Sequence, residues 1–402
     1  MVELSYSASE LEAIRAYRGP LDVWLVVELV GFLILGIVFT RWAPRPLFRW
    51  AEATALSIEK ALPSLASRLS LFERLWGGPG CGASVLFALA VDAFGIALTL
   101  PGSIAFRFFH DRAFGVSHET AAHFALNLVK GSALSIAAFA SLGVGLFGLF
   151  RRTPHAPWLL GFAGAALLGA SVILEHQNAG VYVDHRPLTE EPLATEIQAL
   201  AARAQVNITQ TVVAKTSVMH SIPTAQLSGT PDFRTMTLND TLLETCSRDE
   251  ILAAVAHELG HANESRTAGA VYATLCLFAL LWGVRALMRR AARDGWWGIS
   301  TVGDVRLLPL LMTVFAVLTN FVSPLALAAS RERESAADRF ATGLTHKPNA
   351  LASVLMKNAR ASKTDPDPPQ WVVWLSASHP PLRQRLADLV SDAGPVPPSP
   401  TP

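Results

Sequence analysis

The sequence VAHELGH occupies residues 255–261, inside a run from 248 to 263 that has helical character. Positions four apart lie on one face of a helix, so His257 and His261 can direct two imidazoles at one point. Neutral imidazole is a preferred zinc ligand. Glu258, one residue further on, is placed to take a proton from the attacking water. The spacing predicts a zinc hydrolase, against the alternative of a chance match on an ordinary helix.

Gly260 stands inside this motif although glycine is about 1 kcal/mol worse than alanine in a helix. Its place there needs a reason, and we expect the missing side chain to leave room beside the metal or the substrate. The apolar residues of the same run, Ile251, Leu252 and Val255, give the helix a separate apolar face.

The composition is too apolar for a soluble enzyme. Of the 402 residues 51% are hydrophobic and 16% are charged, and the mean hydropathy is +0.35; these values indicate several membrane spans. The net charge of +1 gives no case for nucleic-acid binding. The three cysteines are scattered without a C-x-x-C pair, so we expect neither a disulfide framework nor a cysteine zinc site.

The order of apolar and polar segments predicts a mainly α, polytopic membrane protein of about six spans with a small α/β protease region at the membrane boundary. The first apolar run has no small-residue cleavage site after it, so we expect a retained span. The expected spans cover residues 21–42, 82–106, 124–150, 158–174, 268–288 and 305–329.

These segments divide the chain into five parts. We expect a membrane region of four spans at 1–177, a catalytic α/β region at 178–267, a membrane hairpin at 268–329, a second catalytic portion at 330–390 and a disordered tail at 391–402. The connection 43–81 is amphipathic and is expected at the interface. In the polar regions the pattern favours strands at 212–214 and 234–238 and helices at 192–203, 331–345 and 349–362.

A catalytic zinc ion held by two histidines needs a third protein ligand. Residues 330–341 read SRERESAADRFA, where Glu334 and Asp338 share one face of the expected helix. Glu334 can bind the metal, and Asp338 can accept the N–H of a ligand histidine and so fix its ring. A solvated helix of i,i+4 ion pairs is the more common reading of such a segment alone. The upstream motif, and spans that can form a hairpin between the two helices, favour the metal role.

With these residues in place, the chain resembles the integral-membrane zinc metalloproteases of the gluzincin type that include the type I CAAX prenyl protease and the bacterial heat-shock membrane proteases. Three blocks carry the resemblance, which covers nearly all of residues 80–390. They are 239–244 followed by 250–261; Ser330-Arg331 with Glu334 and Ala337-Asp338; and Ser378-His379-Pro380-Pro381-Leu382 with Arg385-Leu386. The segment 106–120 also looks like a loop of the prenyl-protease branch.

The resemblance implies that His257, His261 and Glu334 hold one zinc ion per chain and that Glu258 is the general base. It also implies that His379 lies close enough to stabilise the oxyanion. Taken alone, a histidine before two prolines is more often a capping or turn residue.

One departure from the family concerns the substrate. The family has an Asn-Ala pair on an edge strand that helps to hold the peptide backbone, and here Thr224 stands where Asn is expected. We expect Thr224, Ala225 and Gln226, within the segment 217–229, to bind substrate by strand addition with altered positioning.

Polar residues inside the expected spans are costly against lipid and indicate a wet interior or protein contacts. They are Glu28, Asp92, Asn127 and Asn320. The resemblance explains them as the lining of an intramembrane chamber, although Asp92 is equally well explained as a helix-packing residue.

The arginines give conflicting information on orientation. Those at positions 41, 45, 49, 151, 152, 285, 289, 290 and 293 are expected on the face opposite the catalytic region, which by the positive-inside rule makes that region extracytoplasmic. The resemblance implies a cytoplasmic catalytic side, and we favour that side because cationic loops and cavity linings can mislead the charge count.

The leading hypothesis is a membrane-embedded zinc endopeptidase of the EC 3.4.24 type acting on peptide or protein substrates in the bilayer. Processing of prenylated C-termini and clearance of damaged membrane-inserted proteins are rival roles; the spans, the 106–120 loop and the His379 block favour the prenyl branch. A non-catalytic membrane scaffold with a relic protease fold is the alternative from another class, and an intact Glu258 counts against it.

Overall fold

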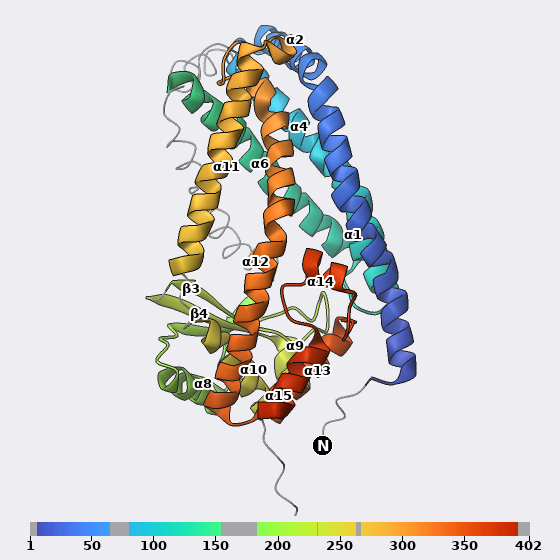
Figure 1. Ribbon diagram of the computed structural model, residues 1–402, viewed down its shortest axis with the longest axis vertical. Coiled ribbons are helices and arrows are strands. Elements are labelled where there is room, and N and C mark those ends of the chain that lie inside the picture. Colours follow the sequence, from blue (N-terminus) through green and yellow to red (C-terminus); the bar gives the residue numbers. More distant parts are fainter. Residues whose placement is uncertain (1–5, 65–79, 154–182, 231, 263–266, 393–402) are drawn as a thin grey trace, which may run out of the picture.

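The computed structural model describes residues 6–64, 80–153, 183–230, 232–262 and 267–392. The molecule is elongated, with long helices running along it and a small sheet at one end (Figure 1). We call this end, formed by the sheet with α8, α9, α10, α13 and α15, the sheet end. The opposite end holds α2 (Pro44–Ala61) and the connection between α11 and α12.

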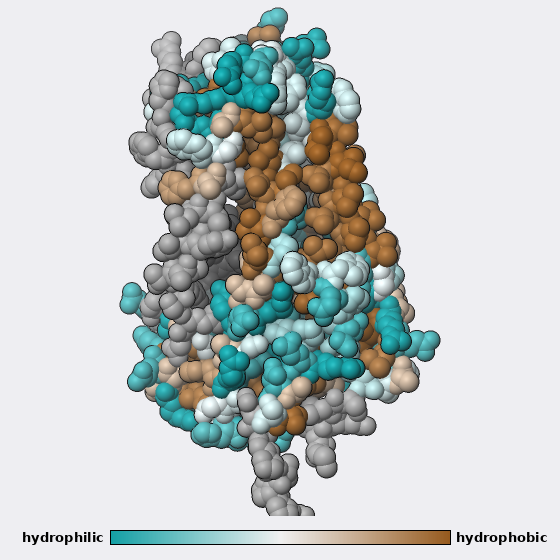
Figure 2. All heavy atoms as spheres, viewed as in Figure 1, coloured by the Kyte–Doolittle hydropathy of each residue, from teal (hydrophilic) through white to brown (hydrophobic). Residues whose placement is uncertain are grey.

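Three helices in the described part of the chain are long and apolar enough to cross a membrane. They are α1 (Ala8–Trp42), the run Cys81–Ala113 and the run Val305–Thr345. The second run joins α4 (Cys81–Gly102), the π-helix η2 (Ser103–His110) and α5 (Asp111–Ala113), and the third joins η4 (Val305–Leu307) to α12 (Leu308–Thr345). Hydrophobic residues form a band over the middle of the molecule between two hydrophilic ends (Figure 2). The predicted spans at 21–42, 82–106 and 305–329 are confirmed as candidate spans.

The other three predicted spans stay predictions. Residues 124–150 lie in α6 (Ala121–Arg152, 32 residues) and 268–288 lie in α11 (Thr267–Arg293, 27 residues). Both helices exceed the roughly 20 residues that a bilayer requires. The predicted span at 158–174 lies outside the described residues.

The long helices extend well beyond the predicted spans. The capping box of Ser7 and Glu10 starts α1, which then continues through Pro20 into the apolar segment without a break. At the other end of the chain, the predicted helix 331–345 is the continuation of α12, which includes Pro324. Helical hydrogen bonds are local, so a change from apolar to polar sequence marks where a helix leaves the apolar region and not where it ends.

The sheet has the strand order β1-β2-β4-β3. Its strands are β1 (His185–Pro187), β2 (Gln210–Ala214), β3 (Ala225–Thr230) and β4 (Phe233–Asn239). β2 and β4, which include the strands predicted at 212–214 and 234–238, pair in parallel, and the other two pairings are antiparallel. β3 is therefore an edge strand. This agrees with the expectation that the segment 217–229 contains one.

The core of the sheet end is built around α10 (Arg248–Ala262), whose Val255, Ala256 and Leu259 are fully buried. Around it lie α8 (Glu191–Arg203), α9 (Asp240–Thr245), α13 (Pro348–Ala361), α14 (Gln370–Ser376) and α15 (Leu382–Asp392). A second apolar core fills the opposite end, with Phe87, Phe147 and Leu307 at its centre.

Gly260 is the contact point of α10 with α12. A Cβ atom on Gly260 would lie 2.9 Å from the Cα atom of Ala337, closer than side chains tolerate. The expectation that Gly260 leaves room for a metal or a substrate is therefore wrong. The space is filled by the backbone of α12, and this close approach brings the residues of the two helices together.

Candidate metal centre

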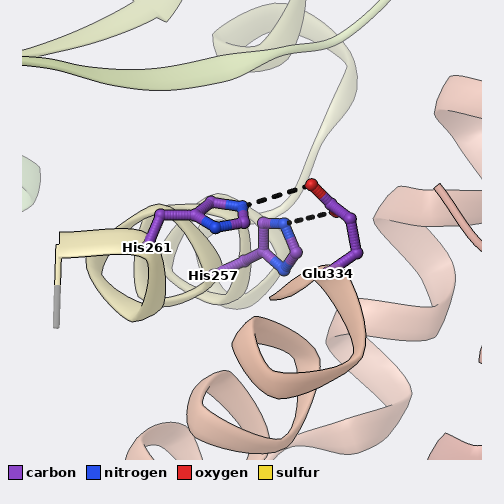
Figure 3. A group of neighbouring side chains, drawn as sticks. All are labelled: His257, His261 and Glu334. Atoms are coloured by element: carbon purple, nitrogen blue, oxygen red, sulfur yellow. Dashed lines mark ion pairs between the residues drawn. The ribbon is translucent and has the colours of Figure 1, made fainter. Parts of the chain in front are cut away.

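Three side chains from two helices meet where α10 crosses α12 (Figure 3). The Nε2 atom of His257 lies 3.3 Å from Oε2 of Glu334, and Nε2 of His261 lies 3.4 Å from Oε1 of the same carboxylate. The two imidazole rings are nearly perpendicular, with centroids 4.9 Å apart. The predicted i,i+4 face is thus present, and the carboxylate from 73 positions further along the chain lies against both rings.

The donor set fits a metal ion. One ligand atom from each of His257, His261 and Glu334 lies within 4.8 Å of the others. Glu334 is buried, yet its Oε2 atom accepts no hydrogen bond from the described residues. A buried carboxylate oxygen without a hydrogen bond is costly unless a cation neutralises it. Two imidazoles and one carboxylate are a donor set of catalytic zinc, which prefers four-coordination with one position left open.

Asp338 lies on the far side of His257. The Nδ1 atom of this histidine lies 2.9 Å from Oδ1 of Asp338. This placement turns Nε2 toward Glu334 and fixes which ring nitrogen faces the centre. Asp338 comes from the same helix as Glu334, one turn further on, so a single stretch of α12 contributes both carboxylates.

Arg385 of α15 places a positive charge beside the carboxylates of Asp338 and Glu334. Its Nε and Nη2 atoms donate to the two oxygens of Asp338, both at 2.7 Å, and Nη2 lies 3.8 Å from Oε2 of Glu334. Arg385 is 7% exposed and Asp338 is 5% exposed. Because a buried ion of either sign is costly alone, this bidentate pair is what allows two carboxylates to stand side by side in the core.

The electrostatics of His257 favour positive charge. Burial alone would lower the pKa of this imidazole, but the carboxylates of Asp338 and Glu334 raise it to about 9. The two carboxylates therefore make this position favourable for a cation.

Glu258 lies beside this cluster and faces the sheet. Its Oε2 atom accepts a hydrogen bond of 3.0 Å from the backbone N–H of Leu227 on β3. Burial raises the pKa of Glu258, and the nearby His257 and the Leu227 N–H act in the opposite direction. A carboxylate with a raised pKa binds a proton more readily than an ordinary one, which is the property of a general base.

His379 lies in the loop between α14 and α15, where its Nε2 atom is 3.4 Å from Oε2 of Glu334. The Nδ1 atom lies 2.8 Å from Oγ of Ser378. The side chain is 56% exposed. It therefore lies on the open side of the cluster, as an oxyanion donor would, and is not a buried fourth member.

A cleft of about 380 Å³ opens beside the cluster. Thr224 and Ala225 line it together with His257, Glu258 and His379. The backbone N–H of Thr224 donates to Oδ1 of Asn239, 3.0 Å away, so this residue is held by the neighbouring strand. Gln226 is exposed and is not among the lining residues, because strand alternation turns its side chain to the other face.

The polar residues of the spans have different surroundings. Asn127 lines a cavity of about 450 Å³ between α4, η2 and α6, where it donates to Glu119, 2.8 Å away. Asp92 is 4% exposed and accepts a hydrogen bond of 2.8 Å from Ser135. Asn127 thus fits the interpretation as a chamber lining and Asp92 the interpretation as helix packing. Asn320 is exposed and bonds only to its own helix within the described residues.

Two groups at the site were not assigned a role from the sequence. Arg385 was noted only as part of a motif block, and the N–H of Leu227 carries no sequence signal of its own. The available signal was that Arg385 follows His379 within the same motif block, since a buried pair of carboxylates requires a cation.

The profile of peptidase family M48 matches residues 187–393, which contain β2, β3, β4 and every residue of the cluster. The chain belongs to peptidase family M48. The resemblance drawn from the three sequence blocks is confirmed, and the chain is a membrane metalloprotease.

Known relatives come from both branches that the sequence suggested. A CAAX prenyl protease 1 homolog of Oryza sativa is 29% identical over 301 residues, covering 72% of this chain and 69% of that protein. A protease HtpX homolog of Acaryochloris marina is 29% identical over 250 residues, covering 58% of this chain and 81% of that protein. The crystal structure of S. mikatae Ste24p superimposes with a TM-score of 0.67 over 96% of this chain and all of that chain. Its sequence identity is 20%, so this likeness shows the fold.

Proposed function

We propose that the protein is a zinc-dependent endopeptidase that holds one zinc ion with His257, His261 and Glu334. The observation that supports this most strongly is the convergence of the three ligand atoms within 4.8 Å, at the crossing of α10 and α12. A zinc ion bound there would act as a Lewis acid toward the scissile carbonyl and would activate water.

The residues around the cluster have three separate roles in this proposal: proton transfer, stabilisation of the transition state and positioning of the ligands. We assign to Glu258 the removal of a proton from the attacking water and its delivery to the leaving nitrogen. His379, on the open side of the cluster, is placed to donate to the oxygen that becomes negative in the transition state. Asp338 and Arg385 do not touch substrate in this proposal; they hold His257 and Glu334 in position.

The cleft supports a preference for an apolar side chain next to the cleaved bond. Beyond the cluster its walls are formed by Ala254, Leu351, Val354, Leu355 and Leu382. The edge strand β3 lies along the same cleft, and substrate would add to it through backbone hydrogen bonds around Ala225. The contribution of Gln226 is then through its backbone, since its side chain faces away.

The proposed parts of the chain have distinct tasks. The portions 178–267 and 330–390 supply the two halves of the site, and the membrane regions at 1–177 and 268–329 hold it at the bilayer. We favour a prenylated C-terminal peptide as substrate, because several relatives are CAAX prenyl proteases that match about 70% of this chain. Clearance of damaged membrane proteins is the second candidate, supported by the HtpX homologs.

The experiment compares wild-type protein with Glu258→Gln for zinc content and peptide cleavage. We expect the variant to retain zinc and to lose activity by about 10²–10⁴-fold, the contribution of a general base. Glu244→Gln, an exposed carboxylate at the end of α9, is the matched control and should cleave as wild type does. Equal cleavage by Glu258→Gln and wild type would end the proposal and leave the scaffold hypothesis.

The same assay separates the substrate classes. A farnesylated C-terminal peptide, its unmodified counterpart and an unfolded reporter protein are offered to wild-type protein. We expect the farnesylated peptide to be cleaved faster than the unmodified one, because the prenyl group partitions into the bilayer beside the site. Faster cleavage of the reporter would instead assign the protein to quality control.

We further propose that the sheet end faces the cytoplasm. Asp249 is exposed at this end, and Asp249→Cys in a chain without native cysteines can be labelled with a membrane-impermeant maleimide. Labelling in lysed cells and none in intact cells is expected. Labelling of intact cells would place the sheet end outside, as the arginine count indicates.

A further inference from the structure

A cavity lined by residues of α1, α2 and α12 lies at the end of the molecule opposite the sheet end. It has a volume of about 730 Å³ and is formed where α1, α2 and α12 meet the connection between α11 and α12. Arg41, Arg45 and Arg49 line it together with Trp296 and Trp297. We call this opening the arginine cavity.

The three arginines carry uncompensated charge. All three side chains are exposed, and none forms an ion pair with the described residues. No acidic residue lines the arginine cavity within the described ranges. Arg306, which approaches the same region beside Gly298, is different because Asp304 neutralises it. Three forked donors around one opening are suited to a phosphate group, which a guanidinium binds through two parallel hydrogen bonds.

One of the two tryptophans is held in an uncommon backbone conformation. Trp297 has a φ of 52°, in the left-handed region, and lies between Gly295 and Gly298, which also have positive φ. Its indole Nε1 donates to the backbone oxygen of Arg41, 3.4 Å away. Such backbone strain persists where the surrounding contacts demand it, and it often marks a functional position. Here it keeps an indole at the entrance of the arginine cavity.

The remaining wall of the arginine cavity is mostly apolar and continues into the membrane helices; its polar members, Thr40 and Thr313, bond to each other through their hydroxyl groups, 2.8 Å apart. Ile37 of α1 and Leu310 of α12 belong to helices that are candidate spans. Ile34 and Val38, next to them on α1, are exposed and apolar. The opening is thus cationic at the outer end and apolar toward the bilayer, with tryptophans at the level where membrane interfaces place them.

We propose that the arginine cavity binds one anionic glycerophospholipid. Its phosphate lies among the guanidinium groups of Arg41, Arg45 and Arg49, and its acyl chains follow the groove toward Ile37 and Leu310. A cavity with both a cationic and an apolar wall fits an amphiphile better than a free anion, and arginines between transmembrane helices are suited to anionic headgroups. The site also gives these three arginines a role that does not depend on which side of the membrane they occupy.

The test measures lipid retention by native mass spectrometry after the protein is exchanged into nanodiscs of phosphatidylglycerol or of phosphatidylcholine. Wild-type protein should retain phosphatidylglycerol in preference to phosphatidylcholine. The triple variant Arg41→Gln, Arg45→Gln, Arg49→Gln should lose this retention by about tenfold or more. The control carries Arg289→Gln, Arg290→Gln and Arg293→Gln, which remove equal charge from α11 outside the arginine cavity, and should retain the lipid.

Three outcomes would overturn the proposal. They are equal loss in both triple variants, equal retention of the two lipids by wild type, and displacement of the lipid by millimolar inorganic phosphate, which would assign the site to a free anion. If the triple variant does not fold, Arg45→Gln alone should lower retention about threefold, with Arg45→Lys between it and wild type. An unchanged Arg45→Gln would then count against the site.

Discussion

The two ends of the molecule treat charge in opposite ways. At the sheet end Asp338 and Arg385 are almost fully buried, and the guanidinium binds the carboxylate through two hydrogen bonds. At the other end Arg41, Arg45 and Arg49 are exposed and lack carboxylate partners among the described residues. A buried charge destabilises the folded protein unless it is paired, whereas an exposed charge is solvated by water and stays available to an external ligand. The first arrangement fits the proposed metal site, and the second fits the proposed phosphate site.

A single helix takes part in both arrangements. α12 contributes Leu310 to the arginine cavity. After crossing the apolar band, it contributes Glu334 and Asp338 to the side-chain cluster around His257. The difference between the ends therefore comes from what packs against α12. α10 and α15 enclose its last turns, whereas its first turn borders an open cavity.

The largest effect is expected from the ligand carboxylate. Glu334→Gln should lose zinc, and its activity should fall by more than the about 10²–10³-fold that one lost transition-state contact costs. Glu332→Gln changes an exposed neighbour on the same helix and should keep both zinc and activity. Zinc content and kcat/KM on one peptide are the measurements. A Glu334→Gln protein with wild-type zinc would show that another residue is the third ligand.

The paired charge of the sheet end can be broken directly. Arg385→Gln leaves two carboxylates without their cation, and removal of one partner from a buried pair costs about 3–5 kcal/mol of unfolding free energy. Arg383 is 73% exposed and pairs with Asp367 on the surface, so Arg383→Gln should cost less than about 1 kcal/mol. Denaturation of both variants in detergent measures the difference. Equal costs would mean that Arg385 does not neutralise the cluster.

The close helix crossing can be tested at its contact point. Gly260→Ala places a methyl group against the backbone of Ala337 and should cost about 1–3 kcal/mol of stability. Gly283 of α11 has nothing within 4 Å of an added Cβ atom, so Gly283→Ala should be neutral or slightly stabilising. Thermal unfolding of the two variants decides the point. If Gly260→Ala is as stable as wild type, α10 and α12 do not approach as closely as described.

The smallest effect is expected on the pH dependence of stability, through Glu250. Burial would raise the pKa of Glu250, but hydrogen bonds from Lys357, Ser353 and Ser247 lower it to about 2, below the ordinary value of 4.5. The folded state thus binds this proton less well than the unfolded state, so the stabilisation is complete above pH 4.5 and is lost as the pH falls toward 2. Unfolding measured between pH 7 and pH 3 should show a shallower acid loss for Glu250→Gln than for wild type. Asp249→Asn, which alters an exposed pair with Lys347, should follow the wild-type curve.

The features that depend on local spacing within one helix were predicted correctly from the sequence. His257 and His261 share a face because a helix fixes that spacing, and Glu334 and Asp338 share another for the same reason. The meeting of Glu334 with the two histidines depended on one more inference, the hairpin that returns α12 to α10.

What the sequence did not predict depends on contacts between distant segments. Gly260 received the wrong explanation because only the packed structure shows Ala337 against it. The partnership of Arg385 with Asp338 joins residues 47 positions apart, with α13 and α14 between them in the chain. The arginine cavity is similar, since the arginines were evident from the sequence but the tryptophans that close it come from residues 296 and 297.

Zinc K-edge X-ray absorption on purified wild-type protein tests the central claim most directly. The account predicts about one zinc ion per chain with two imidazole nitrogens at roughly 2.0–2.1 Å and oxygen ligands at roughly 2.0–2.2 Å. A spectrum without imidazole scattering, a sulfur ligand, or an active preparation that contains no zinc would contradict it.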